Sequence, residues 1–124
     1  MDSKAKGIML LGEAVVDLQD TDPKSVAYNI AADKTAKVFA VLIHSPTASL
    51  AGGTDFDIGS GANADTWKQT VDLSSMTSTD DYMYITASNV KYTIEPNSAA
   101  FGIKPITGAT ADAQATMCVF GKEE

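Results

Sequence analysis

Apolar and polar residues alternate along most of this chain, and a period of two residues is the pattern of a half-buried β-strand. Between residues 13 and 19, Ala14, Val16 and Leu18 fall on one face of an extended segment. The same alternation predicts strands over residues 26–30, 82–85, 90–94 and 114–119, and shorter segments predict strands over 54–58, 66–73 and 101–106. The stretch from Val38 to Ile43 is apolar throughout, which is typical of a central strand covered on both faces.

Turn-forming residues separate these segments, as at Asp20–Pro23, Gly52–Gly53 and Gly59–Gly61. No window of about 11 residues carries a helical stripe. The pattern predicts an all-β, single-domain β-sandwich over residues 13–124, jelly-roll-like, with about eight short antiparallel strands. Residues 1–12, which mix lysines with a short apolar run, are predicted to form an N-terminal arm that is frayed or lies on a neighbouring subunit.

Residues on the apolar face of each predicted strand should form the core between the two sheets. These are Val16, Leu18, Ile30, Phe39, Val41, Ile43, Val71, Ile85, Ile94, Met117 and Val119.

The charge of the chain narrows the classes of partner. The net charge is −7, and all nine basic residues are lysine, so arginine is absent. An acidic protein without arginine is a poor ligand for nucleic acid or an anionic membrane, because both bind through cationic side chains. No apolar run approaches the ~20 residues of a membrane span, and the first residues lack the pattern of a signal peptide. We therefore expect neither nucleic acid nor membrane as a partner.

Enzymatic chemistry has few candidate residues. His44 is the only histidine and Cys118 the only cysteine. A catalytic triad would have to combine His44 with a serine or Cys118 and a carboxylate, whereas a lone cysteine in a strand is usually a small buried hydrophobe. One histidine and one cysteine also do not complete a four-ligand zinc site without carboxylates. We expect no enzyme, no catalytic residue and no cofactor.

The segment from residue 55 to residue 65 is a weak candidate for calcium, since hard oxygen ligands alternate beside a glycine-rich turn. The candidate ligands are Asp55, Asp57, Asn63 and Asp65. The segment departs from the EF-hand pattern, because Ser60 replaces the glycine of position 6 and Thr66 replaces the glutamate of position 12. An exposed strand edge followed by a polar turn explains it better.

Aromatic residues raise a third possibility, a carbohydrate-binding face. Tyr82, Tyr84, Tyr92 and Trp67 occur in or near predicted strands. Aromatic side chains commonly fill cross-strand positions, and the tyrosines are expected on alternating faces beside apolar neighbours. Packing is therefore the preferred explanation.

The stretch from Val26 to Leu73 carries a family resemblance. It includes the sequences VAYNI and DKT, then HSPTASLAGGTDFDIG and GANADTW. In these segments the sequence resembles that of small structural proteins of tailed bacteriophages and prophages. The resemblance implies a β-sandwich on the surface of the virion, assembled in the host cytoplasm, and offers no catalytic residues.

From that resemblance we expect a capsid decoration or cement protein that binds and stabilises the head shell. Its partner would be the major capsid protein or another virion protein, and the chain would form a homo-oligomer such as a trimer. A tail or fibre-base component and a carbohydrate-binding module remain the alternatives. Apolar or cationic residues of the arm and of the 45–65 region are the expected contacts, namely Lys4, Ile8, Leu10, Leu11, Pro46, Leu50 and Phe56.

Overall fold

A computed structural model of the chain describes residues 8–86, 94–95 and 100–123. Within these ranges the chain forms nine β-strands and no helix, which confirms the all-β prediction. The strands are β1 (Met9–Asp17), β2 (Lys24–Asn29), β3 (Ala36–His44), β4 (Asp55–Ser60), β5 (Lys68–Val71), β6 (Tyr82–Thr86), β7 (Ile94–Glu95), β8 (Ala100–Thr107) and β9 (Gln114–Glu123). Of the strand predicted over residues 90–94, only the last residue is described.

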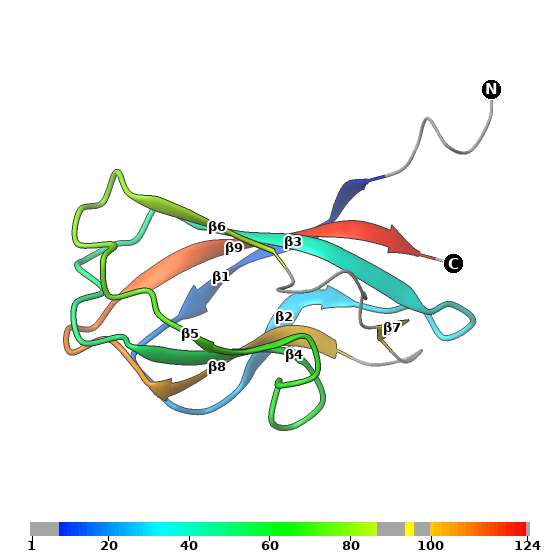
Figure 1. Cartoon of the computed structure of the whole chain (residues 1–124), viewed down its shortest axis with the longest axis horizontal. Helices are drawn as coiled ribbons and strands as arrows, with labels where there is room; N and C mark the ends of the chain where they lie inside the picture. The colour runs from blue at the N-terminus through cyan, green and yellow to red at the C-terminus, as the bar shows by residue number, and fades with distance from the viewer. Residues whose placement is uncertain (1–7, 87–93, 96–99, 124) are drawn as a thin grey trace.

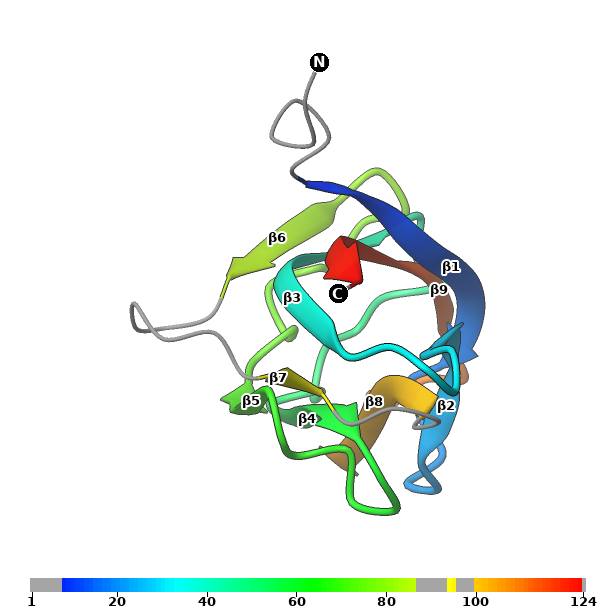
Figure 2. The same ribbon diagram turned by 90° about the vertical axis from the view of Figure 1, so that its right-hand side faces the viewer.

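The strands form two antiparallel sheets that face each other as a sandwich (Figure 1). The first sheet has the order β1-β9-β3-β6, with β7 also pairing with β3, and the second has the order β2-β8-β4-β5. The end-on view of Figure 2 shows the two layers separated by their shared interior. Pairing is nested along the chain: β4 pairs with β5, β3 with β6, β2 with β8 and β1 with β9.

The apolar faces of the two sheets meet in one core. Nine of the predicted core residues are buried there: Val16, Leu18, Ile30, Val41, Ile43, Val71, Ile85, Met117 and Val119. Phe101 and Ile103 of β8 and Phe56 and Ile58 of β4 supply much of the core on the second sheet. The burial of Ile94 lies outside what the structure describes.

Strand β3 differs from its prediction in two respects. Phe39 is half-buried instead of buried, because the pairing of β3 with β9 shifts register between Val38 and Ala40 and takes Phe39 out of the regular alternation. Leu42 and His44 are half-buried too, so the face of β3 that turns away from the core is only partly shielded from solvent. The central position of β3 in its sheet is confirmed, but coverage of both faces is not.

Strand β1 begins at Met9, four residues before the predicted start of the sandwich. Met9 pairs with Gly121 and Leu10 with Phe120, and Leu11 packs against the core. The apolar run from Ile8 to Leu11 thus extends a strand, because β9 offers pairing groups beyond Val119. Residues 1–7 of the predicted arm lie outside the described part of the chain.

Two polar contacts tie the sheets together. The indole Nε1 of Trp67, just before β5, donates a buried hydrogen bond to the carbonyl of Val38 in β3 at 2.8 Å. The hydroxyl of Tyr28 in β2 donates to the carboxylate of Glu123 at the end of β9. Desolvation, followed by the bond and charge of Glu123, raises the pKa of Tyr28.

Candidate functional site

The face of the first sheet that turns away from the core carries an unusual set of exposed apolar side chains. Val15 is 61% exposed, Tyr82 70% and Tyr84 60%, and Leu10 is also exposed. The half-buried Leu42 and Phe120 lie on the same face. We call the surface formed by Leu10, Val15, Leu42, Tyr82, Tyr84 and Phe120 the outer face.

Strand register explains why these side chains share a surface. Residues directly opposite on neighbouring strands point to the same side of the sheet. One row across β1, β9, β3 and β6 therefore consists of Val15, Thr116, His44 and Tyr82, and the adjacent row consists of Glu13, Cys118, Leu42 and Tyr84. The outer face is thus built from all four principal strands of the sheet.

The tyrosines correct one expectation. Tyr82 and Tyr84 lie on the same face and are mostly exposed, because Met83 and Ile85 take the alternate positions that point inward. The expectation that they fall on alternating faces is therefore wrong, although each fills a cross-strand position, Tyr82 opposite His44 and Tyr84 opposite Leu42. Trp67 is buried in the core as a packing residue. Tyr92 lies outside the described residues.

The two tyrosines border an open depression of about 590 Å³ at the end of β3 and the beginning of β6. Its lining consists of Leu42, His44, Ser45, Thr79, Asp80, Asp81, Tyr82 and Tyr84. Aromatic faces beside carboxylate, hydroxyl and imidazole groups offer both apolar contact and hydrogen bonding to a small polar ligand.

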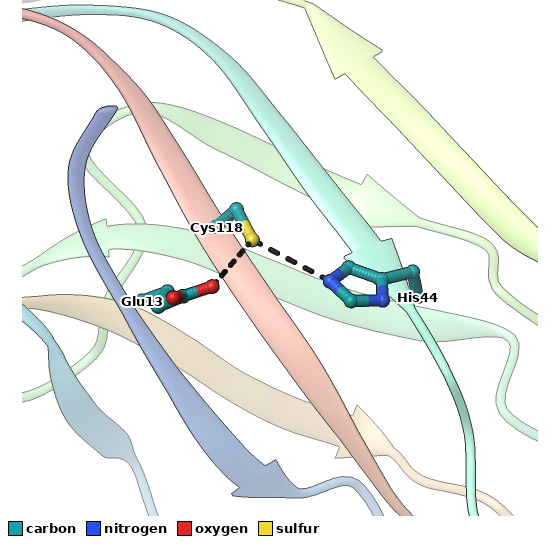
Figure 3. A group of neighbouring side chains, drawn as sticks. All are labelled: Glu13, His44 and Cys118. Carbon is teal, nitrogen blue, oxygen red and sulfur yellow. Dashed lines mark hydrogen bonds between the residues drawn. The ribbon is translucent and has the colours of Figure 1, made fainter. Parts of the chain in front are cut away.

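Next to this depression, Glu13 of β1, Cys118 of β9 and His44 of β3 converge on the outer face (Figure 3). The Cys118 Sγ lies 3.4 Å from Glu13 Oε2 and 3.6 Å from His44 Nε2. On the other side of the imidazole, His44 Nδ1 lies 2.8 Å from the hydroxyl of Ser45. Glu13 is exposed, His44 half-buried and Cys118 buried.

The electrostatics of this cluster do not suit nucleophilic catalysis. Desolvation, with the hydrogen bond and negative charge of Glu13, raises the pKa of Cys118 to about 11. A catalytic cysteine needs the opposite shift, because its thiolate is the nucleophile. In a triad the carboxylate also stands behind the histidine, whereas here Glu13 stands against the thiol and Ser45 occupies the position behind His44.

The calcium candidates do not converge. Asp55 and Asp57 lie on β4, whereas Asn63 and Asp65 lie in and after the turn that follows Ser60. The carboxylate of Asp57 accepts a hydrogen bond from the backbone N–H of Thr70 at 3.2 Å. Within the described ranges, Glu13, His44 and Cys118 are the one group of three or more histidine, cysteine, aspartate or glutamate side chains close enough to share a metal ion.

Several predicted interface residues belong to the interior. Leu50 and Phe56 are fully buried in the core, Pro46 is buried, and Leu11 packs against the core. The connection after His44 folds back onto the sandwich: the backbone N–H of Thr47 donates to Gln114 and that of Leu50 to Met76. Leu50, Phe56 and Pro46 are therefore not surface contacts, and Leu11 is half-buried.

Ile8 and Leu10 are exposed as an interface requires, and Lys4 lies outside the described residues. The predicted set of interface residues did not include Val15, Tyr82 and Tyr84, which are exposed. Their alternation with core residues is visible in the sequence and is the signal that could have revealed them.

Comparison of the chain with family models, with curated proteins and with solved structures finds no match in any of the three. No helix in the described part of the chain is long and apolar enough to cross a membrane.

Proposed function

We propose that this chain is a non-enzymatic structural protein of a bacteriophage particle, a decoration or cement protein that binds and stabilises the head shell. The observation that carries the proposal is the exposed apolar outer face. Several exposed apolar side chains on one face of a folded domain commonly mark a contact with another macromolecule, because burying them in an interface removes them from water.

The strand order supports the architecture that this role requires. Nested pairing of the first strand with the last, the second with the next to last and so on inward is the pattern of a jelly roll, once the short β7 is set aside. This order supports our proposal that the sandwich is a jelly roll, a class that includes viral capsid and lectin domains.

The proposed partner is the major capsid protein or another virion protein, contacted by a homo-oligomer such as a trimer. The chain would sit on the virion surface after assembly in the host cytoplasm. Its net charge of −7 would keep unbound copies apart in solution, while the outer face supplies apolar contact. Many bound copies would stabilise the shell by mass action, because they bind the intact shell and not its separated subunits.

Occupancy on purified particles tests this proposal. Tyr82→Ser with Tyr84→Ser should sharply reduce binding to phage heads that lack the protein, measured by co-sedimentation. The matched control is Ile106→Ser, since Ile106 is 44% exposed but lies on β8 in the second sheet. Equal occupancy for the wild type and the double variant would refute the assignment of the outer face. Binding to tails in place of heads would favour the tail or fibre-base alternative.

The depression beside Tyr82 and Tyr84 favours carbohydrate binding as a second candidate function. Stacking of a sugar ring on a tyrosine, with hydrogen bonds to Asp80 or Asp81, would use the groups that line it. A glycan array followed by calorimetry on Tyr84→Ala distinguishes the two functions. Glycan binding that this variant abolishes, together with no binding to heads, would select the carbohydrate-binding module.

A further inference from the structure

The docking function proposed above makes no use of the thiol, imidazole and carboxylate that converge on three neighbouring strands. We propose that Glu13, His44 and Cys118 form a site for a Zn²⁺ ion. The site would bind the ion through Glu13 Oε, His44 Nε2 and Cys118 Sγ, with a water molecule as the fourth ligand.

The spacing of the three donor atoms fits a tetrahedral ion. Zinc–ligand bonds of about 2.0–2.3 Å place neighbouring ligand atoms of a tetrahedron roughly 3.3–3.6 Å apart. Cys118 Sγ lies 3.4 Å from Glu13 Oε2 and 3.6 Å from His44 Nε2, and all three donors lie within 4.8 Å of one another. The Glu13 and His44 donors would approach each other by rotation of the exposed Glu13 side chain.

The backbone holds the donors in this arrangement. Glu13 and Cys118 are direct cross-strand partners in the β1–β9 pair. His44 is paired with Thr116, two residues along β9 from Cys118, so it reaches the thiol diagonally. All three ligands therefore stand on paired strands of one sheet, which are more rigid supports than loops.

The surroundings of His44 orient its ring for metal binding. When Nδ1–H donates to the Ser45 hydroxyl at 2.8 Å, the lone pair of Nε2 is directed to Cys118. Metal-bound histidines commonly donate their other ring N–H to an oxygen, which holds both the tautomer and the orientation. Ser45 is thus an outer partner of the site, a residue that contacts a metal ligand but not the metal.

The kinds of donor select the metal. Thiolate and imidazole ligands suit zinc and other borderline or soft ions, whereas calcium and magnesium prefer oxygen ligands alone. When zinc binds, the Sγ–H bond of Cys118 breaks, the thiolate forms a bond to zinc, and the proton leaves to solvent. The ion also places positive charge against the Glu13 carboxylate, which otherwise faces a neutral thiol.

Metal titration of the full, chelator-treated chain tests the site. Calorimetry with Zn²⁺ should give one ion per chain, and Zn²⁺ should raise the melting temperature, because the ion binds the folded state. Glu13→Gln, His44→Gln and Cys118→Ser should each weaken binding by more than about tenfold, the smallest loss expected even for an outer partner. Co²⁺ should give a thiolate-to-metal absorption band that Cys118→Ser abolishes and Asp112→Asn retains.

The control variant Asp112→Asn removes an exposed carboxylate outside the cluster and should bind Zn²⁺ as the wild type does. Because Glu13 is exposed, Glu13→Gln should fold normally. Its zinc affinity therefore tests the site even if Cys118→Ser does not fold. Failure of the wild type to bind Zn²⁺, or affinity unchanged by Glu13→Gln and His44→Gln, would overturn the proposal. Neither result bears on binding to phage heads.

Discussion

At the scale of single residues, Cys118 is buried although it does not belong to the core. It is only 5% exposed, as expected for a small buried hydrophobe, yet it lies on the side of β9 that turns away from the core. Glu13 and His44 cover it there. Because Glu13 and His44 are the neighbours that cover it, the buried thiol of Cys118 lies within reach of two other possible metal ligands.

Asp17 provides a prediction about pH. The backbone N–H groups of Gln19 and Asp20 donate to its carboxylate at 2.8 and 3.2 Å, and the bond from Gln19 contributes most to lowering the pKa of Asp17 below its ordinary value. A pKa that is lower in the folded state means that this contribution to stability is present above the unfolded pKa of about 3.9 and is lost as the pH falls through the folded pKa.

Asp17→Asn should therefore reduce stability at pH 7 and lose that effect in acid. Urea unfolding of both proteins at pH 7 and at several values below pH 4 measures the difference. A difference that stays constant down to the most acidic pH would show that the charge of Asp17 is not the cause.

At the scale of elements, β3 supports the core through its inward residues. Ile43 is fully buried among the side chains of both sheets. Ile43→Ala should reduce the free energy of unfolding by about 2–5 kcal/mol, since it removes apolar contact and leaves a cavity. Ile106→Ala on β8 is the exposed control and should change it by less than about 0.5 kcal/mol. Chemical denaturation measures both, and equal losses would contradict the assigned core.

The start of β1 gives a second prediction at this scale. Deleting residues 1–12 is the direct test of an arm, but it would also remove strand pairs with β9. A loss of docking could then not be distinguished from a loss of stability. The neighbours Leu10 and Leu11 separate the two, because Leu10 is 48% exposed and Leu11 packs against the core.

Leu11→Ser should reduce stability by about 1–3 kcal/mol, as expected for loss of a largely buried leucine. Leu10→Ser should leave the melting temperature nearly unchanged and reduce occupancy on phage heads. A large loss of stability in Leu10→Ser would show that this leucine belongs to the core and not to the outer face.

At the scale of the whole molecule, the sandwich depends on contacts between its sheets. Trp67 spans them, with its ring edge-on to Phe101 at a centroid distance of 6.2 Å and its indole N–H bonded to Val38. Trp67→Phe removes a buried hydrogen bond, so it should reduce the free energy of unfolding by about 1–3 kcal/mol.

Circular dichroism should follow this unfolding, because Trp67 is the only tryptophan and its loss removes the tryptophan fluorescence signal. The control is Tyr84→Phe, which removes a hydroxyl from an exposed ring and should have little effect. Equal stability of Trp67→Phe and the wild type would mean that the bond to Val38 does not help to hold the sheets together.

The sequence by itself determined the all-β class, the position of most strands and part of the core. Nine of the eleven predicted core residues are buried, whereas Phe56, Ile58, Phe101 and Ile103 were not among the predicted ones. Each of these follows from local alternation, since successive side chains on a strand point to opposite faces. The absence of arginine and the net negative charge were likewise readable without a structure.

Only the tertiary structure decided which strands are neighbours and which surfaces remain open. Glu13, His44 and Cys118 meet because β1, β9 and β3 are adjacent in one register, and no local pattern specifies pairing between segments so far apart in the chain. For the same reason, Leu50 and Phe56 were expected at the surface and proved to be buried: their burial depends on where the chain folds over the sandwich, which is set by long-range packing.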